Sequence, residues 1–277
     1  MSTPVVTFTA AGAVDATYRV DELVRGAFMR ASAYERELSG KGVNLSAALA
    51  HASVPTAAVV VLGADDLVFA AGSPHAALLR PVAVPGATRV NTSIIDADGA
   101  TTKVNAPTPP LTGESWQRAL AATVEAIDEV DAGWLVVCGT LPAVDGEPAD
   151  LGPLLEAAAT RGVRVGADTS GAGLVRLVDR GAGVALAKPN THELAELTGR
   201  TLRTIGDVAG AARTLVRRGL ELVYVSMGAD GVLAVTADRI VHAHATAPRL
   251  ANTAGAGDAS LAGFLVGLDA GGDALAA

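Results

Sequence analysis

The stretch WLVVC at residues 134–138 decides the fold, because this short apolar run opens a regular alternation. A helical stretch follows at residues 152–161, a second apolar run at 163–167, then a further helix and a third apolar run at 183–187. Apolar runs of strand length that alternate with helices are typical of βαβ units, whose parallel strands are covered by helices on both faces. We therefore predict an α/β fold in which helices flank a mostly parallel central sheet.

The C-terminal half continues this alternation. Helices are predicted at Thr191–Leu197 and Ile205–Arg218, a strand at Leu222–Ser226, and a hairpin over residues 231–242.

The first third of the chain has a different pattern. Residues 13–37 and 88–104 alternate polar and apolar side chains and contain turn residues such as Asp98-Gly99. This pattern predicts antiparallel strands outside the parallel sheet. We expect them to form a small lid over the mouth of the α/β body, which suits chemistry that must exclude water.

The composition and net charge of the chain argue against several classes of function. The chain has 277 residues, of which 50% are hydrophobic, and we expect one domain over residues 1–277. A net charge of −8 argues against nucleic acid or a membrane surface as a partner. Cys138 is the only cysteine, which fits the cytoplasm and predicts a small core residue on a strand. No apolar run approaches the roughly 18 residues of a membrane span, so we expect a soluble protein.

The segment ANTAGAGD at residues 251–258 leads directly into the apolar stretch 259–268. Its glycines allow close backbone approach to a ligand, and the N-terminus of the following helix attracts anions. Asp258 falls in the first turn, where a carboxylate can accept a proton from an attacking hydroxyl. An aspartate in a first turn is equally typical of a simple helix cap, so both interpretations stand at this point.

A second glycine-rich entry to a helix is Ser39-Gly40-Lys41-Gly42-Val43-Asn44. Lys41 between two glycines can reach a phosphate, although an exposed loop lysine is the ordinary alternative. Asn44 is in place to cap the predicted helix over residues 45–52. The spacing is not that of a Walker loop, so this segment does not predict a P-loop enzyme.

Three further segments are ambiguous in isolation. In Lys188–Glu193, Asn190 and Glu193 form either a capping box, which is favoured, or oxygen ligands to the water shell of Mg²⁺. The turn at residues 226–231 either closes a hairpin or lets the backbone approach a nucleotide. The segment DTSG at residues 168–171 matches an aspartic-protease signature, but that chemistry needs two matched loops in a β-rich chain, so we discard it.

The order of these motifs is more specific than any one of them. A lysine-containing glycine loop, then K-P-N-x-x-E, then S-x-G-x-x-G, then G-A-G-D before an apolar helix resembles the ribokinase-like PfkB family of ATP-dependent carbohydrate kinases. Within that family the chain is most similar to the branch that phosphorylates sugar phosphates, which includes 1-phosphofructokinase and tagatose-6-phosphate kinase. The segments TRVN at 88–91, VCGTLP at 137–142 and DTSG at 168–171 also resemble this branch.

The resemblance implies a ribokinase-like three-layer α/β/α fold with a β-sheet lid, ATP and Mg²⁺ as cofactors, and a small sugar phosphate, fructose 1-phosphate, as the expected substrate. It implies that Asp258 is the catalytic base and that Gly255, Ala256 and Gly257 form the anion hole. It places Ser226, Gly228, Gly231 and Lys188 along ATP, with Asn190 and Glu193 organising Mg²⁺ through water. On the substrate side it implies Asp15, Gly40, Lys41, Asn44, Arg89, Arg30 and Thr140. A homodimer is expected on the same ground.

The chain departs from this family at several positions. Extra residues precede Asp15, Ser39 replaces a usual glycine, Ser93 stands where this branch often has a lysine, and the chain ends at Ala277, soon after the predicted catalytic helix. A non-catalytic sugar-phosphate sensor on the same fold is the alternative from another class. A kinase for an unphosphorylated sugar is disfavoured, because Lys41 and Arg89 are two cations suited to a second phosphate.

Overall fold

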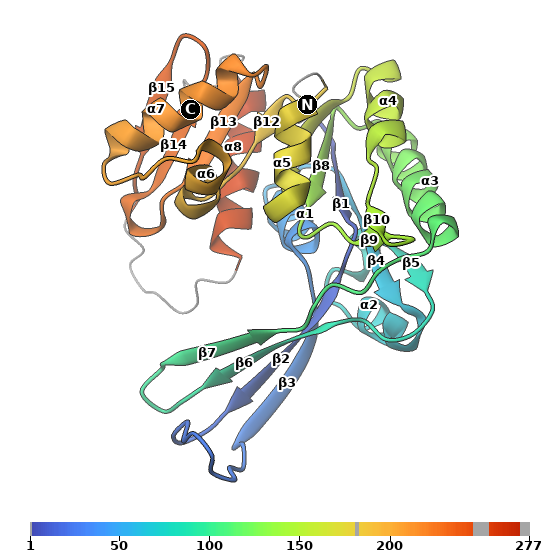
Figure 1. The fold of residues 1–277 in the computed structure, drawn as a ribbon. Helices are drawn as coiled ribbons and strands as arrows, with labels where there is room; N and C mark the ends of the chain where they lie inside the picture. Colours follow the sequence, from blue (N-terminus) through green and yellow to red (C-terminus); the bar gives the residue numbers. More distant parts are fainter. Residues whose placement is uncertain (1, 181–182, 246–254, 272–277) are drawn as a thin grey trace.

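The computed structural model describes residues 2–180, 183–245 and 255–271. Its body is built on a nine-stranded sheet in the order β15-β14-β13-β12-β11-β8-β1-β4-β5 (Figure 1). These strands are β1 (Val5–Thr9), β4 (Thr56–Gly63), β5 (Leu79–Val84), β8 (Trp134–Cys138), β11 (Arg164–Asp168), β12 (Leu186–Ala187), β13 (Leu222–Ser226), β14 (Val232–Val235) and β15 (Ile240–Ala243). All pairs from β5 to β13 are parallel, and only the pairs β13–β14 and β14–β15 are antiparallel. The predicted mostly parallel sheet is confirmed.

Helices cover both faces of this sheet, which makes three layers. They are α1 (Lys41–His51), α2 (Leu67–Ala71), α3 (Gly113–Val130), α4 (Gly152–Thr160), α5 (Gly171–Arg180), α6 (Thr191–Thr198), α7 (Ile205–Arg217) and α8 (Ala256–Gly271). Side chains of α3 to α7 pack into one apolar core, and those of α1 and α8 pack into another. Successive side chains of β8 point to opposite faces of the sheet. Those of Leu135 and Val137 pack into the first core, and those of Trp134, Val136 and Cys138 pack into the second.

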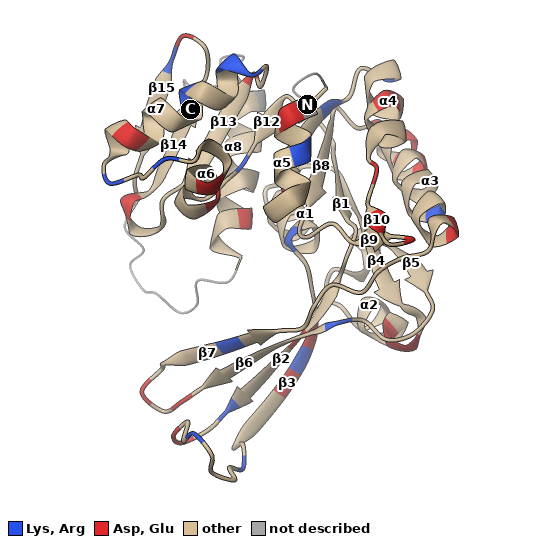
Figure 2. Ribbon diagram, viewed as in Figure 1, with Lys and Arg blue, Asp and Glu red and all other residues tan. Residues whose placement is uncertain are grey.

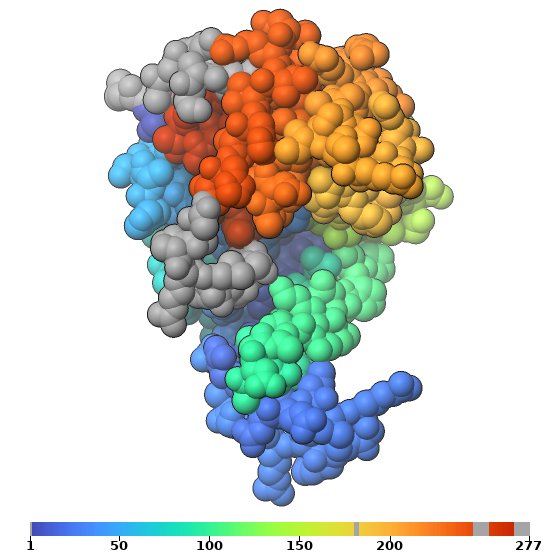
Figure 3. Space-filling view, turned by 90° about the vertical axis from the view of Figure 1, so that its left-hand side faces the viewer, coloured from blue at the N-terminus to red at the C-terminus, as the bar shows by residue number. Residues whose placement is uncertain are grey.

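The lid is a separate four-stranded sheet that projects from the body (Figures 1 and 3). Its order is β3-β2-β6-β7, formed by β2 (Ala13–Arg19), β3 (Ala33–Ser39), β6 (Val90–Ile95) and β7 (Thr101–Asn105). The outer pairs are antiparallel as predicted, but the central pair β2 and β6 is parallel, so an all-antiparallel lid was wrong. The reason is topological: β2 follows β1 and β6 follows β5, so both strands leave the body and run outward side by side.

Two local boundaries also differ from the sequence predictions. Helix α1 begins at Lys41 with Gly40 as its N-cap, so Asn44 lies inside the first turn and does not cap the helix. The third apolar run pairs only over Leu186–Ala187, because Gly183 turns the chain with a φ of 95° before the strand begins. Among the described segments, no helix combines the length and hydropathy that a bilayer crossing requires.

Candidate active site

A cleft of about 420 Å³ opens where the carboxyl ends of the central strands meet the base of the lid. This edge is where ligands bind in open α/β sheets, because loops and helix N-termini converge there. The sequence-predicted residues that line it are Gly40, Lys41, Asn44, Arg89, Thr140, Lys188, Gly255, Gly257 and Asp258. They come from five separate parts of the chain, so the fold brings together most of the side chains that the sequence singled out. Residues 251–254 of the glycine-rich segment lie outside the described residues.

Asp258 lies in the first turn of α8 and is only 6% exposed. Its Oδ2 accepts a hydrogen bond of 2.9 Å from Nδ2 of Asn44, which lies in the first turn of α1. Burial raises the pKa of the Asp258 carboxyl and Asp168 adds to that rise, whereas Asn44, Lys188 and Lys41 oppose it. A carboxylate with a raised pKa at the mouth of a cleft is better suited to accept a proton than an ordinary surface aspartate.

Helix α1 holds Lys41 and Asn44 in place because it packs directly onto β1. The amide of Gly42 donates to Thr9 Oγ1 at 3.2 Å, and Thr7 Oγ1 donates to the Gly42 carbonyl at 2.8 Å. A Cβ at Gly42 would overlap Thr9 Oγ1 and lie 3.0 Å from Thr7 Oγ1. This close approach of helix to strand therefore requires glycine at residue 42.

A buried carboxylate to which the sequence analysis assigned no role lies behind the cleft. Asp168 ends β11 and is 1% exposed, with Oδ1 2.7 Å from Nζ of Lys41 and Oδ2 3.1 Å from Nζ of Lys188. Burial opposes the charged form of Lys41, but Asp168 outweighs it and raises the pKa of that ammonium group. The available signal was its position at the carboxyl end of a predicted parallel strand, a place where polar residues gather at a site.

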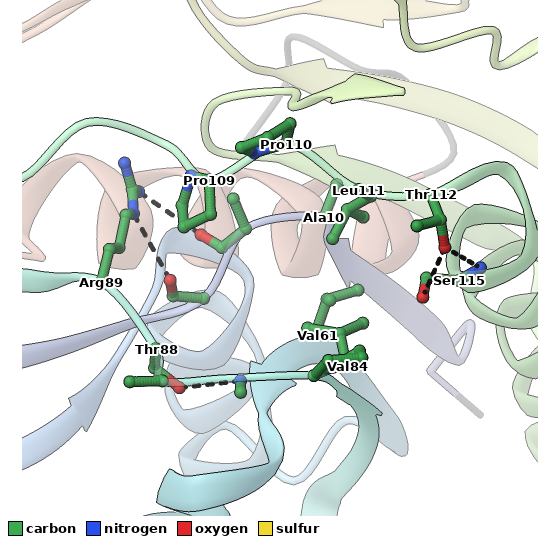
Figure 4. Close-up of a pocket in the computed structure, with 15 residues that line it drawn as sticks. Ala10, Val61, Val84, Thr88, Arg89, Pro109, Pro110, Leu111, Thr112 and Ser115 are labelled. Carbon is green, nitrogen blue, oxygen red and sulfur yellow. Dashed lines mark hydrogen bonds between the residues drawn. The ribbon is translucent and has the colours of Figure 1, made fainter. Parts of the chain in front are cut away.

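Arg89 separates the cleft from a smaller cavity of about 160 Å³, which is lined mainly by apolar side chains such as Val61, Pro109 and Leu111 (Figure 4). Its guanidinium donates to the carbonyls of Ala11 and Gly12 at 3.4 Å and to Thr108 Oγ1 at 3.0 Å. Burial lowers the pKa of Arg89, and Asp15 opposes that effect. Among the described residues Arg89 forms no ion pair, so its charge is available to an anion.

The base of the lid adds a row of polar side chains to the cleft. Asn91 on β6 lies between Asp15 on β2 and Asn105 on β7, and its Nδ2 donates to Asp15 Oδ1 at 3.1 Å. Asn91 and Asn105 line the cleft and were also missed by sequence analysis. Asp15 lines an adjoining groove that it shares with Asn44, Gly255 and Ala256.

Arg30 is the one predicted substrate residue that lies far from this region. It follows β2 in the loop at the outer end of the lid, where its guanidinium lies over the exposed ring of Phe28, 5.9 Å from the centroid.

The residues predicted to contact ATP and Mg²⁺ gather at the neighbouring strand ends of β12 and β13. Asn190 and Glu193 form a capping box: Asn190 Oδ1 accepts from the Glu193 amide at 2.9 Å, and Glu193 Oε2 accepts from the Asn190 amide at 2.8 Å. The amide of Ser226 donates to the Pro189 carbonyl at 3.1 Å, which ties β13 to this segment.

Gly228 opens a short 3₁₀ turn after β13, and Gly231 has a φ of 84°. A Cβ at Gly231 would overlap the carbonyl oxygen of Ala243, so the β14–β15 hairpin alone accounts for this glycine.

Comparison with known proteins agrees with this geometry. A family model described as pfkB family carbohydrate kinase matches residues 5–277. The chain is 36% identical to a 1-phosphofructokinase of Rhodobacter capsulatus, over 97% of this chain and 86% of that protein. It is 37% identical to a 1-phosphofructokinase of Xanthomonas campestris, over 97% of this chain and 85% of the relative.

Solved structures are similar over the same extent. Phosphofructokinase-2 of Escherichia coli in complex with fructose-6-phosphate has a TM-score of 0.82 and 27% identity, covering 97% of this chain and 88% of the other. Ribokinase of Arabidopsis thaliana, at 21% identity and a TM-score of 0.73 over 98% and 87% of the two chains, shows that the fold is ribokinase-like. With a family match over nearly its whole length and an Asp258 cleft at the expected edge of the sheet, the chain belongs to the pfkB family of carbohydrate kinases.

Proposed function

We propose that this chain transfers the terminal phosphoryl group of ATP to the C6 hydroxyl of fructose 1-phosphate, giving fructose 1,6-bisphosphate and ADP. The observation that carries the proposal is the cleft lined by a buried carboxylate, Asp258, and by a cation, Arg89, that has no ion-pair partner in the described part of the chain. The names of the two curated relatives support fructose 1-phosphate as the acceptor. We further propose that body and lid form one catalytic domain that works as a homodimer in the cytoplasm.

In this mechanism the C6 hydroxyl oxygen of the sugar attacks the terminal phosphorus of ATP, and Asp258 accepts the proton of that hydroxyl. The new oxygen–phosphorus bond forms while the bond from that phosphorus to the bridging oxygen of ADP breaks. The backbone amides of Gly255, Ala256 and Gly257 start α8, so the positive end of the helix dipole faces the phosphoryl group as it moves. Lys41 and Lys188 add two ammonium groups at the same cleft.

Substrate placement falls to the lid and its base. Arg89 binds the phosphate that the sugar already carries, and Asp15, Asn44, Gly40 and Thr140 contact its hydroxyls. Arg30 lies too far out in the lid to join this set within the same chain, so we leave it out.

The side chains around Asn190 and Glu193 determine how Mg²⁺ could be held at this site. Within the described ranges, no three His, Cys, Asp or Glu side chains gather as direct metal ligands. Glu193 uses Oε2 in the capping box and keeps its second carboxylate oxygen, which suits contact to a hydrated ion. Asn190 and Glu193 therefore fit Mg²⁺ held through water, where the ion would neutralise charge on the ATP phosphates.

The proposal predicts ADP release from Mg·ATP that depends on fructose 1-phosphate. The assay compares fructose 1-phosphate, tagatose 6-phosphate, fructose 6-phosphate and fructose under the same conditions. Preference for another sugar phosphate would correct the substrate and keep the kinase. Binding of a sugar phosphate by calorimetry without any ADP release would replace the enzyme with a sensor.

Arg89→Met should raise the KM for fructose 1-phosphate by roughly 10- to 100-fold, because a hydrogen bond to a charged group contributes about 1.5–3 kcal/mol. The KM for ATP should change little. Arg118→Met is the matched control, since Arg118 is exposed, donates to the Ala83 carbonyl at 3.3 Å and does not line the cleft. Steady-state kinetics with both substrates varied measure the effect. An equal rise in KM for unphosphorylated fructose would contradict phosphate binding by Arg89.

A further inference from the structure

The buried Asp168 carboxylate connects two cations that reach the cleft from different parts of the fold. Lys41 comes from the first residue of α1, and Lys188 follows β12. Each oxygen of the carboxylate pairs with one lysine. Oδ1 lies 2.7 Å from Nζ of Lys41, and Oδ2 lies 3.1 Å from Nζ of Lys188. The Asp168 main-chain carbonyl also accepts from the Gly139 amide at 2.9 Å, which fixes the end of β11 against the end of β8.

Both lysines need such an anchor. A lysine is a point charge on a flexible stem with about 2 kcal/mol of rotamer entropy, so its ammonium group has no fixed place without a partner. The Asp168 side chain is 1% exposed and that of Lys188 is 6% exposed, whereas Lys41 remains 36% exposed toward the cleft. Asp168 and its two lysine partners form a bridge, which we call the Asp168 bridge. In it, a single carboxylate holds one buried cation, Lys188, and one accessible cation, Lys41.

Lys188 packs against the residue before Asp258, and Lys41 begins the helix whose Asn44 bonds Asp258. A Cβ at Gly257 would lie 3.4 Å from Nζ of Lys188, so this ammonium group packs directly against the glycine loop before Asp258. Lys41 starts the helical turn that carries Asn44, whose amide bonds the Asp258 carboxylate at 2.9 Å. Movement of either lysine would therefore disturb the reacting groups.

We propose that Asp168 is a positioning residue for phosphoryl transfer, which acts by holding Lys41 and Lys188 at fixed places around the transferred group without touching either substrate. This inference rests on the proposed kinase function. It gives a role to a carboxylate that takes no part in the proton or phosphoryl transfer, and it explains why a charged group is buried at the end of β11.

Asp168 also influences the base through space. The charged groups that face Asp258 are Asp168 from β11, Lys41 from α1 and Lys188 from the segment after β12, and Asn44 is its hydrogen-bond donor. Asp168 raises the pKa of Asp258, and the two lysines lower it. Removal of Asp168 should therefore lower the pKa of Asp258, and removal of either lysine should raise it.

The test compares Asp168→Asn with Lys41→Met. Asp168→Asn should lower kcat by about 100-fold, the loss expected when reacting groups are displaced by about 1 Å. The acid limb of its kcat/KM profile should move to lower pH, because a carboxylate that raises the pKa of Asp258 is gone. Lys41→Met should move the same limb to higher pH. Loss of structure alone would not shift the two variants in opposite directions.

Asp128→Asn is the matched control, because it makes the same change in net charge on the exposed face of α3, where Asp128 pairs with Arg161 at 2.7 Å. It should leave kcat and the pH profile unchanged. In the double variant Asp168→Asn with Lys41→Met, the loss in kcat should be much smaller than the product of the single losses, because residues in one network do not act independently. Multiplicative losses would overturn the proposal.

Two measurements separate failure of this inference from failure of the proposed function. The pKa of Asp258 can be followed by the carboxyl ¹³C chemical shift in labelled wild-type, Asp168→Asn and Lys41→Met proteins, with no turnover needed. If wild type releases no ADP while the pKa of Asp258 still shifts as expected in the two variants, the proposed kinase function is refuted and the positions of Asp168 and the lysines are supported. If Asp168→Asn does not fold, the Lys41→Met titration carries the test, and an unmoved Asp258 pKa in that variant would refute it.

Discussion

Asp258→Asn should reduce kcat by about 10²- to 10⁴-fold, the range that a positioned general base contributes. The amide has the same shape and keeps a contact with Asn44, but it accepts no proton from the sugar hydroxyl. The amides of residues 255–257 and the two lysines remain, so a residual rate above the solvent background should persist. Phosphoryl transfer measured as ADP release, with saturating fructose 1-phosphate and ATP, gives the ratio directly.

The same substitution should leave the protein as stable as wild type or more stable at neutral pH. The folded-state pKa of Asp258 lies above its unfolded value, so the stability linked to this group is fully present below the unfolded pKa. This stability is lost as pH rises through the folded-state pKa, because the buried Asp258 carboxyl then has to ionise. An asparagine has no such loss. Thermal unfolding of both proteins from pH 4 to 8 should therefore show a gap that widens with pH.

Wild-type turnover by Asp258→Asn would exclude Asp258 as the base and would leave its place in the cleft without a catalytic explanation. A lower unfolding temperature together with lost activity would point instead to a structural role. Glu114→Gln, which changes an acidic residue in the first turn of α3, is the control for removing a carboxylate from a helix start, and it should keep full activity.

Gly42→Ala should lower both stability and activity. The new methyl group would overlap Thr9 Oγ1, and α1 can relieve this contact only by moving away from β1. Overpacking of this kind costs about 1–3 kcal/mol, which corresponds to a fall of several degrees in Tm for a chain of this size. The displaced helix carries Lys41 and Asn44, so kcat/KM should fall as well.

Gly263→Ala is the matched control for this effect. Gly263 also lies in a helix, α8, but a Cβ there would have no neighbour within 4 Å. Because alanine is the better helix former by about 1 kcal/mol, this variant should be as stable as wild type or slightly more stable. Calorimetry and steady-state kinetics on both variants make the comparison. Equal behaviour of the two alanine variants would show that the close approach at residue 42 is not required.

The sequence predicted the elements whose signal is local. Strands β8 and β13 were predicted to the residue, since β8 is an unbroken buried run of five apolar residues and β13 has four buried apolar residues before Ser226. The start of α1 was placed four residues late, because Gly40 and Gly42 are poor helix formers. In the fold those glycines allow the helix to touch β1, and this tertiary contact outweighs their low propensity.

Features that depend on distant pairing could not be predicted from local pattern. Lys41 and Asp168 are separated by 127 residues, so nothing near either residue signals their bridge. The lysine loop and the aspartate at the start of the last helix were identified because each combines a charged side chain with adjacent glycines. Asn91 and Asn105 are uncharged and have no adjacent glycine, so the local sequence does not single them out. They come together only because the strands β6 and β7 pair in this register.

The position of β1 in the middle of the nine-stranded sheet governs how this chain can fold. Val5 pairs with Thr56 on one side and with Trp134 on the other, so β1 gains its second partner strand only after the chain has been made as far as β8. Closing loops of that length must precede the contacts that reward them, which slows folding. Until β8 is synthesised, β1 keeps one edge without a partner strand, and an open apolar edge of this kind can pair with other chains and aggregate.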